Sequence, residues 1–142
     1  MKTKHNPLIK LFWRLHLKLY LWSKGRIGNK MRGLPVLILT TKGKQTGLLR
    51  TKALMYLPYG KDYVVIASNL GKQNHPGWWI NLTAEPHATV QIGDAQYSVR
   101  AREAQDEERE TLWKALAEKS SDYEQYRTWT SRCIPVVILE KQ

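Results

Sequence analysis

The sequence predicts one domain of the mainly β class with α helices, in which about six antiparallel strands form a barrel or an α+β sheet. Its 142 residues, 42% of them apolar, match the size and composition of a single globular domain. After Gly33 the hydrophobic pattern changes from a helical period to short strand-like runs separated by glycine turns. Helical patterns are few, and most follow the first strands.

The first element is expected to be an amphipathic helix over residues 6–23, with Asn6 as N-cap before Pro7. Cations recur every four residues, so the segment is neither a signal peptide nor a membrane span. Two interpretations of its apolar stripe stay open: it lies in a membrane interface, or it caps an open end of the domain. The stripe consists of Leu8, Phe12, Leu15, Leu19 and Trp22, and the cationic row of Lys10, Arg14 and Lys18.

Residues 1–32 are therefore assigned to this basic helix and a linker, and residues 33–142 to the β domain. The first two strands of that domain are expected at 34–41 and 49–57, around a turn bounded by Gly43 and Gly47. A third strand follows at 63–68. A short helix, 75–83, has Pro76 near its start.

The second half continues with two strands joined at Gly93-Asp94, two helices and a last strand. In the first helix, Asp106 is the expected cap and acidic residues fill the first turn. Its inward side chains are expected to be Leu112, Trp113 and Leu116. The ranges are 88–92 and 96–103 for the strands, 106–119 and 121–130 for the helices, and 134–140 for the last strand.

Charge is segregated along the chain. Residues 1–61 contain 14 Lys and Arg and no Asp or Glu, whereas residues 62–142 contain 9 basic and 12 acidic side chains, so the two parts carry +14 and −3. Such a field indicates an anionic partner: a phosphate, an acidic lipid or a nucleic acid. The single cysteine, Cys133, permits no internal disulfide, and no clustered ligands predict a metal site.

Two segments have the residue types of a binding site. The turn at 40–50 supplies backbone amides, the Thr46 hydroxyl, Lys44 and Arg50 for a phosphate, although it lacks the first glycine of a Walker A loop. The segment 75–86, HPGWWINLTAEP, places Trp78 and Asn81 on one helical face. Because adjacent helical residues point to different faces, one tryptophan of the Trp78-Trp79 pair can pack in the core while the other lines a pocket.

In combination, these motifs resemble the deazaflavin-dependent nitroreductases and quinone reductases. The matching order is GKxTGxxR, VVIASN, HPxWWxNLxAxP, DEERxxLW and IPVVILE, over residues 33–141. The resemblance implies a split β-barrel related to the pyridoxamine phosphate oxidases and flavin reductases. It also implies coenzyme F420 as cofactor and a quinone or nitroaromatic as hydride acceptor.

The resemblance also implies residue roles. The turn would hold the coenzyme's phosphate tail, with Gln45 where relatives have a second basic residue and with Lys42 or Lys52 as a replacement. The full cofactor set is Lys44, Gln45, Thr46, Arg50, Lys52, Ala53, Ala67, Ser68, Asn69, Trp78 and Asn81. The acceptor pocket would consist of Met55, often a tyrosine in relatives, with Tyr123, Tyr126 and Trp129.

The catalytic residues implied are Ser68 and a tyrosine hydroxyl, with Tyr126 preferred to Tyr123, as donors to the acceptor oxygen. A cytoplasmic enzyme is expected, a monomer or homodimer, with contact to an anionic membrane at its inner face left open. Three alternatives remain: a split barrel that uses FMN, a carrier that binds F420 without turnover, and a basic nucleic-acid-binding protein. The last is disfavoured because no nucleic-acid-reading motif is present.

Overall fold

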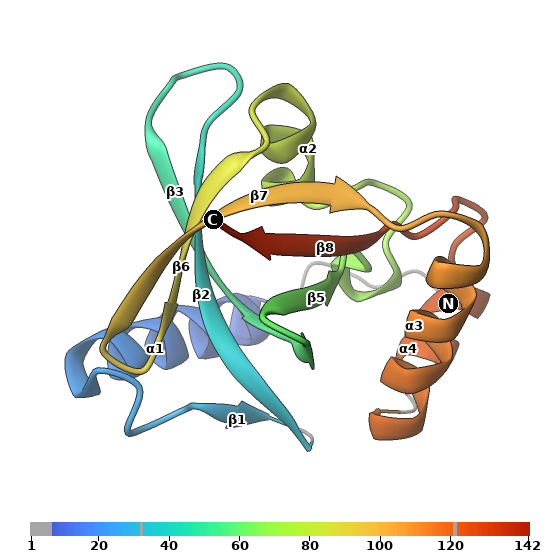
Figure 1. The fold of residues 1–142 in the computed structure, drawn as a ribbon. Coiled ribbons are helices and arrows are strands. Elements are labelled where there is room, and N and C mark those ends of the chain that lie inside the picture. Colours follow the sequence, from blue (N-terminus) through green and yellow to red (C-terminus); the bar gives the residue numbers. More distant parts are fainter. Residues whose placement is uncertain (1–6, 32, 121) are drawn as a thin grey trace.

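The computed structural model describes residues 7–31, 33–120 and 122–142 (Figure 1). The expected cap Asn6 lies outside these residues. The elements are α1 (Pro7–Ser23), β1 (Lys30–Met31), β2 (Leu34–Lys42), β3 (Leu49–Met55), β4 (Leu57–Tyr59), β5 (Asp62–Ile66), the 3₁₀ turn η1 (Asn69–Gly71), α2 (Gly77–Ala84), β6 (His87–Ile92), β7 (Ala95–Glu103), α3 (Asp106–Lys119), α4 (Asp122–Trp129) and β8 (Val136–Lys141).

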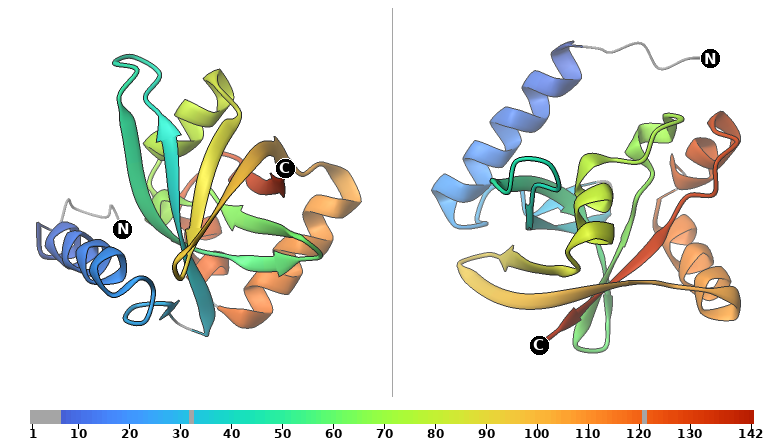
Figure 2. Two further views of the ribbon diagram at one scale, coloured as in Figure 1. Left: turned by 60° about the vertical axis from the view of Figure 1, so that its left-hand side comes forward. Right: turned by 90° about the horizontal axis from the view of Figure 1, so that it is seen from above.

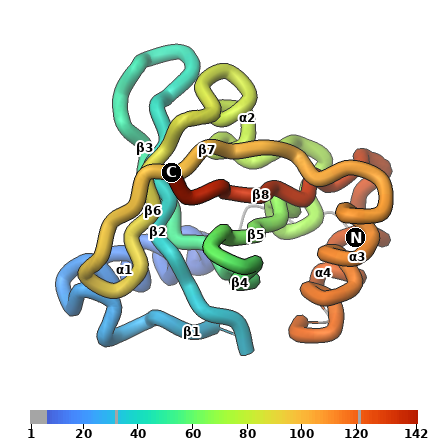
Figure 3. Tube along the Cα trace, viewed as in Figure 1, coloured from blue at the N-terminus to red at the C-terminus, as the bar shows by residue number. Residues whose placement is uncertain are grey.

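The strands form one antiparallel, eight-stranded sheet in the order β1-β2-β6-β7-β8-β5-β4, with β3 paired to β2. The sheet curls into a half-barrel, with α1 at one side and α3 and α4 at the other (Figures 1 and 2). The predicted fold class is confirmed. The tube in Figure 3 shows the chain turning back between β4 and β5, and it shows β6 lying beside β2, with which it pairs.

Two short strands were not predicted. The expected strand 49–57 is two pieces, β3 and β4, separated at Tyr56, whose N–H donates to Pro35 O at 3.0 Å. The other, β1, has two residues. Strands of two or three residues are shorter than the span over which apolar alternation is readable, so their patterns are not visible in the sequence.

The curled sheet has a buried face on each side. One core cluster joins Leu37 and Leu39 of β2 to Trp78, Trp79 and Leu82 of α2. On the opposite side α3 and α4 cover β5 and β8, while α1 covers Val36 and Ile38 of β2 and Ala53 of β3. Full burial of each such side chain stabilises the fold by about 1.5–3 kcal/mol.

Helix α1 packs against β2 and β3, but with a different face from the predicted stripe, so the expectation that the stripe caps the domain is wrong. Trp13, Leu17 and Tyr20 face the sheet, and His16 is buried against the loop at Gly28. The Tyr20 side chain is fully buried, and its hydroxyl accepts from Gly93 N–H at 2.9 Å. Leu8, Phe12, Leu15, Leu19 and Trp22 are 46–79% exposed. Of the helices described, not one combines the length and apolarity needed to cross a membrane.

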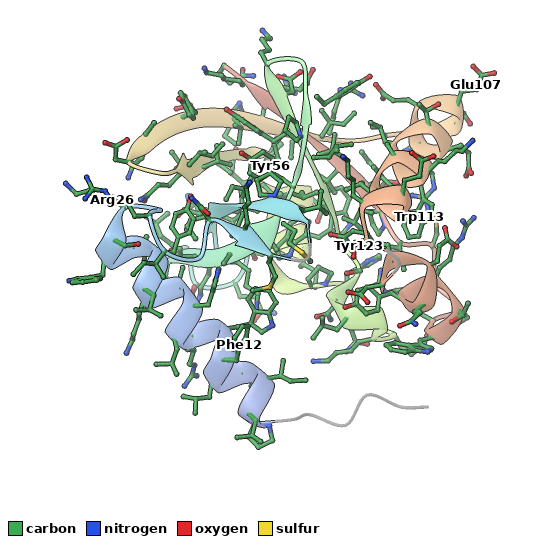
Figure 4. All side chains as sticks on the ribbon, turned by 90° about the horizontal axis from the view of Figure 1, so that it is seen from below. Phe12, Arg26, Tyr56, Glu107, Trp113 and Tyr123 are labelled. Carbon is green, nitrogen blue, oxygen red and sulfur yellow. The ribbon has the colours of Figure 1, made fainter. Side chains whose placement is uncertain are left out.

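Helix α3 has the predicted inward residues: Leu112, Trp113 and Leu116 are buried against the sheet and α4. Figure 4 shows Trp113 and Tyr123 on neighbouring turns of α3 and α4. The predicted cap is wrong, because Asp106 is the first helical residue and its backbone φ is 52°. Gln105 occupies the N-cap position with no side-chain cap bond, and the acidic side chains of the first turn interact favourably with the helix dipole at this end.

Candidate functional site

The β2–β3 hairpin directs its cations toward α2. In the observed register Thr41 pairs with Arg50, Leu39 with Lys52 and Leu37 with Leu54. Paired residues of neighbouring strands share a face, and alternate residues along one strand do so as well. Since Leu37 and Leu39 pack with Trp78 of α2, Arg50 and Lys52 lie on the α2 side of the sheet. Ala53 and Met55 lie on the other side, next to α1.

The turn of this hairpin is closed by its own backbone. Gly43 N–H donates to Leu48 O at 2.8 Å, and Gly47 N–H donates to Gly43 O at 2.9 Å. Thr46 Oγ1 accepts from Leu48 N–H at 3.2 Å. A Cβ at Gly43 would stand 2.9 Å from Thr46 Oγ1 and 3.0 Å from Leu48 O, so the closed turn has no room for a side chain there. Lys44, Gln45 and Thr46 are exposed at its tip.

Asn81 attaches this turn to α2. Its Oδ1 accepts from Lys44 N–H at 3.0 Å, and its Nδ2 donates to Thr41 Oγ1 at 3.1 Å. Both ends of the amide are thus used to hold the hairpin against the helix that carries Trp78. The expected contact of Asn81 with a ring edge stays a prediction, whereas its positioning of the turn is an observed role that the sequence did not indicate.

Two lysines from other elements lie close enough to Lys52 to act on its charge. The pKa of Lys52 is lowered by partial burial first, and then by the positive charges of Lys72 and Lys10. Lys72 follows η1, and Lys10 belongs to α1. Uncompensated cations at close range favour an anionic ligand, since its charge removes their mutual repulsion.

The end of β5 adds a buried wall to the same side. Ala67 is fully buried in the cluster that contains Trp78 and Trp79, and Ser68 is 8% exposed. Both tryptophans are buried, so the expected division into one core and one pocket-lining indole is not seen here. Asn69 begins η1, and its Nδ2 donates to Asn74 O at 3.0 Å.

The predicted acceptor residues come together around α4. The rings of Tyr123 and Tyr126 meet edge to face at 6.2 Å between centroids, and Tyr126 lies 5.6 Å from Trp129. Met55 and Tyr126 pack against the core cluster that contains Tyr123. Burial raises the pKa of the Tyr123 hydroxyl, so this phenol remains protonated at neutral pH.

The sequence interpretation missed Arg132 and Gln73. Arg132 Nη2 donates to Ala67 O at 3.0 Å and to Ser68 O at 2.9 Å. Gln73 Oε1 accepts from Thr130 Oγ1 at 3.1 Å. Neither residue stands in a motif with a known role, and the partners are 57 to 65 positions away, so spacing along the chain carried no signal.

The comparisons with known proteins agree with this arrangement. The F420H(2)-dependent quinone reductase family model matches residues 12–141. An F420H(2)-dependent quinone reductase of Mycobacterium tuberculosis is 37% identical over 133 residues, which are 91% of this chain and 89% of that protein.

Solved structures show the same fold. An F420-H2 dependent reductase, FDR-A, has a TM-score of 0.68 and 39% identity over 75% of this chain and 94% of its own. A structure described as a domain-swapped dimer has a TM-score of 0.71 and 33% identity over 95% of this chain and 100% of its own. A pyridoxamine 5'-phosphate oxidase-like protein of Listeria innocua, at 16% identity and a TM-score of 0.54 over 90% of this chain and 94% of its own, shares the split-barrel fold. This chain belongs to the F420H(2)-dependent quinone reductase family.

Proposed function

We propose that this protein transfers a hydride from reduced coenzyme F420 to a quinone, with nitroaromatic compounds as alternative acceptors. The observation that carries the proposal is the β2–β3 register, which directs Arg50 and Lys52 to the α2 side. The family supports the same conclusion, because the relatives that match over most of the chain are F420H(2)-dependent quinone reductases.

The residues present suit the phosphate and carboxylate groups of this coenzyme. Lys44, Thr46 and Arg50 would hold the phosphate, since a closed turn with ammonium, hydroxyl and guanidinium donors matches a tetrahedral anion. Lys52 and Lys72 extend the cationic surface toward Ser68. No acidic residue occurs before Asp62, so the hairpin itself contributes no carboxylate that would repel the coenzyme.

The bound coenzyme supplies the hydride. The protein's own task is to orient the reactants, exclude water and stabilise the negative charge that develops on the acceptor oxygen. The Tyr126 hydroxyl is proposed as the donor to that oxygen, with Ser68 as a second donor. Tyr123, which is buried and protonated, fixes the Tyr126 ring through their edge-to-face contact.

A fluorescence titration with oxidised F420 beside FMN tests the cofactor. We expect F420 to bind at micromolar or lower concentration and FMN much more weakly. Equal or tighter FMN binding would support the FMN alternative instead. Stopped-flow oxidation of F420H2 by a soluble quinone then separates an enzyme from a carrier, because a carrier binds the coenzyme without turnover.

Tyr126→Phe tests the donor. We expect hydride transfer to slow by about five- to a hundred-fold, the equivalent of 1–3 kcal/mol for a lost hydrogen bond, with coenzyme affinity nearly unchanged. Tyr59→Phe, at an exposed tyrosine whose hydroxyl donates to Glu108 at 3.1 Å, is the matched control. A wild-type rate in Tyr126→Phe would leave Tyr126 as a pocket wall only.

We also propose that α1 docks on an anionic membrane surface, where quinones reside. The exposed apolar side chains listed above run beside Lys10, Arg14 and Lys18, the combination that binds acidic interfaces. A symmetric pair of copies joined through the same face would bring the two cationic rows near each other, which disfavours self-association there. The relative described as a domain-swapped dimer makes a second copy the alternative occupant.

Vesicle sedimentation distinguishes docking of α1 on lipid from pairing with a second copy of the chain. Wild-type protein is expected to bind phosphatidylglycerol vesicles and not phosphatidylcholine vesicles, and Leu15→Ser with Leu19→Ser to bind at least ten-fold more weakly. Ile80→Ser, at an apolar residue of α2 that is 40% exposed, is the control and should bind as the wild type does. Unchanged vesicle binding, or a light-scattering mass that falls from dimer to monomer in the double variant, would overturn lipid docking.

A further inference from the structure

The segment that leaves β5 contains a strained bend. Asn69, Leu70 and Gly71 have backbone φ values of 47°, 56° and 77°. Two of these residues carry a Cβ that disfavours this left-handed region, so such a bend persists only where its surroundings fix it. A Cβ at Gly71 would stand 2.9 Å from Trp129 Cε3 and 3.2 Å from Tyr126 Cα, so the bend lies directly against α4.

Arg132 holds both arms of this bend. On the arm before it, Nη2 donates to Ala67 O at 3.0 Å and to Ser68 O at 2.9 Å. On the arm after it, Nε donates to Lys72 O at 3.0 Å, and Nη1 lies 3.0 Å from His75 Nδ1. All three guanidinium nitrogens are used, and only a rigid planar fork reaches acceptors spread in this way.

Gln73 joins the same bend to the end of α4. Its Nε2 donates to Trp129 O at 3.3 Å, and its Oε1 accepts from Thr130 Oγ1 at 3.1 Å and Ser131 Oγ at 3.3 Å. The pairing of β5 with β8 ends at Ile66 and Val136, followed by Ala67 N–H donating to Pro135 O at 3.0 Å. Beyond that point, the side chains of Arg132 and Gln73 connect the segment at Ser68 to the end of α4.

We propose that Arg132 is a positioning residue that fixes Ser68 and the Tyr126–Trp129 wall relative to each other. Its effect on catalysis rests on the proposed function, while its effect on the bend does not. In Arg132→Gln, we expect hydride transfer to fall at least ten-fold. F420 affinity should fall by a smaller factor than the rate, because the hydrogen bonds of Arg132 to the described residues go to the bend and not to the phosphate-holding turn of the β2–β3 hairpin.

Hydrogen exchange on the full chain gives a readout independent of any activity. Arg132→Gln should speed exchange in the peptides that cover 68–75 and 126–131 and leave those of β2, β3 and α3 unchanged. Arg127→Gln is the control, since Arg127 sits on α4 but contacts Trp113 and Glu124 instead. Lack of hydride transfer in the wild type would defeat the proposed function alone. Unchanged exchange at the bend would defeat the positioning role.

The pH profile supplies a further readout. His75 Nδ1 accepts from the Arg132 guanidinium, so the imidazole ring is neutral in this contact. Partial burial, and then the positive charge of Arg132, lower the pKa of His75, whereas the negative charge of Glu103 raises it. The contact is complete above the folded-state pKa, which lies under the ordinary value of about 6.5, and is lost as pH falls through it. His75→Gln should abolish this acid limb of the hydride-transfer rate.

Should Arg132→Gln fail to fold, Arg132→Lys decides the matter, because it keeps the charge but loses the fork. Slow hydride transfer and fast exchange at the bend in Arg132→Lys would support the positioning role. A wild-type rate with wild-type exchange would overturn it, as would a uniform rise in exchange over the whole chain, which indicates global destabilisation only.

Discussion

At Lys52 the requirements of the fold and of the proposed coenzyme site oppose each other. Burial and the neighbouring cations lower its pKa, so the charged ammonium is disfavoured in the folded chain relative to the unfolded chain. Stability therefore rises as pH increases from the folded-state pKa of Lys52 toward the ordinary value of about 10.4. Below the folded-state pKa the fold carries this penalty in full, and a bound anion would remove part of it.

Lys52→Met should consequently separate stability from binding. Without coenzyme, we expect the variant to be as stable as the wild type or more stable by less than about 1 kcal/mol, since residue 52 is exposed and solvent screens its charge. With F420 bound, the wild type should be the more stable of the two proteins, because it binds the coenzyme more tightly and gains more stability from it. Thermal melts without and with F420 measure the stability of the free protein and the stabilisation that the coenzyme adds. A variant that binds F420 as tightly as the wild type would remove Lys52 from the site.

Arg50 is the next residue of β3 on the same face as Lys52, toward the turn, and it pairs with Thr41 of β2. Arg50→Ala should weaken F420 binding by about 1.5–3 kcal/mol, the range for hydrogen bonds to charged groups. The loss should shrink at high salt because the side chain is exposed. Isothermal titration at two salt concentrations measures it. Arg100→Ala on β7 is the control, and equal affinities in the two variants would argue against a phosphate contact.

Among the elements, α1 has two apolar faces with different tasks. Tyr20 is fully buried and bonded to Gly93, whereas Leu19 is 46% exposed. Tyr20→Ala should lower the free energy of unfolding by about 3–5 kcal/mol, as for other large buried aromatic residues, and Leu19→Ala by less than about 0.5 kcal/mol. Urea denaturation checks the pair. Equal losses would mean that the two faces are not distinguished in solution.

How far the sequence predicts these elements depends on how local their causes are. The long strands and α3 were predicted because their periodicity is local. The face of α1 that packs on the sheet is not predictable in this way. Trp13, Leu17 and Tyr20 form one apolar face and the predicted stripe forms another, and only the shape of the sheet determines which face is buried. Arg132 was missed for a related reason: its partners are backbone carbonyls of a bend that spacing does not reveal.

Across the whole molecule, charge is divided between two ends. Figure 4 shows Arg26, just beyond α1, and Glu107 of α3 at opposite extremes. The acidic first turn of α3 (Asp106, Glu107 and Glu108) is thus remote from the hairpin and α1. An anionic coenzyme should therefore be steered toward the hairpin end.

The association rate tests this steering. We expect the rate constant for F420 binding to fall steeply as salt rises and to fall at constant salt in Lys44→Gln. Glu107→Gln, a change of the same size in net charge at the far end, should leave it nearly unchanged. Stopped-flow fluorescence measures all three, and a rate that follows net charge regardless of position would contradict the steering.

The hairpin register has a consequence for how the proposed binding surface can diverge. Arg50 and Lys52 share the α2 side only because the turn from Gly43 to Leu48 has its present length. A single inserted residue that shifted β3 by one position would exchange its two faces, directing both cations toward α1 and the apolar Ala53 and Met55 toward α2. The length of the turn therefore determines whether the cationic or the apolar side chains of β3 face α2, and with them the kind of ligand that the surface can bind. Insertions of two residues, which restore the facing, should be tolerated among descendants where insertions of one are lost.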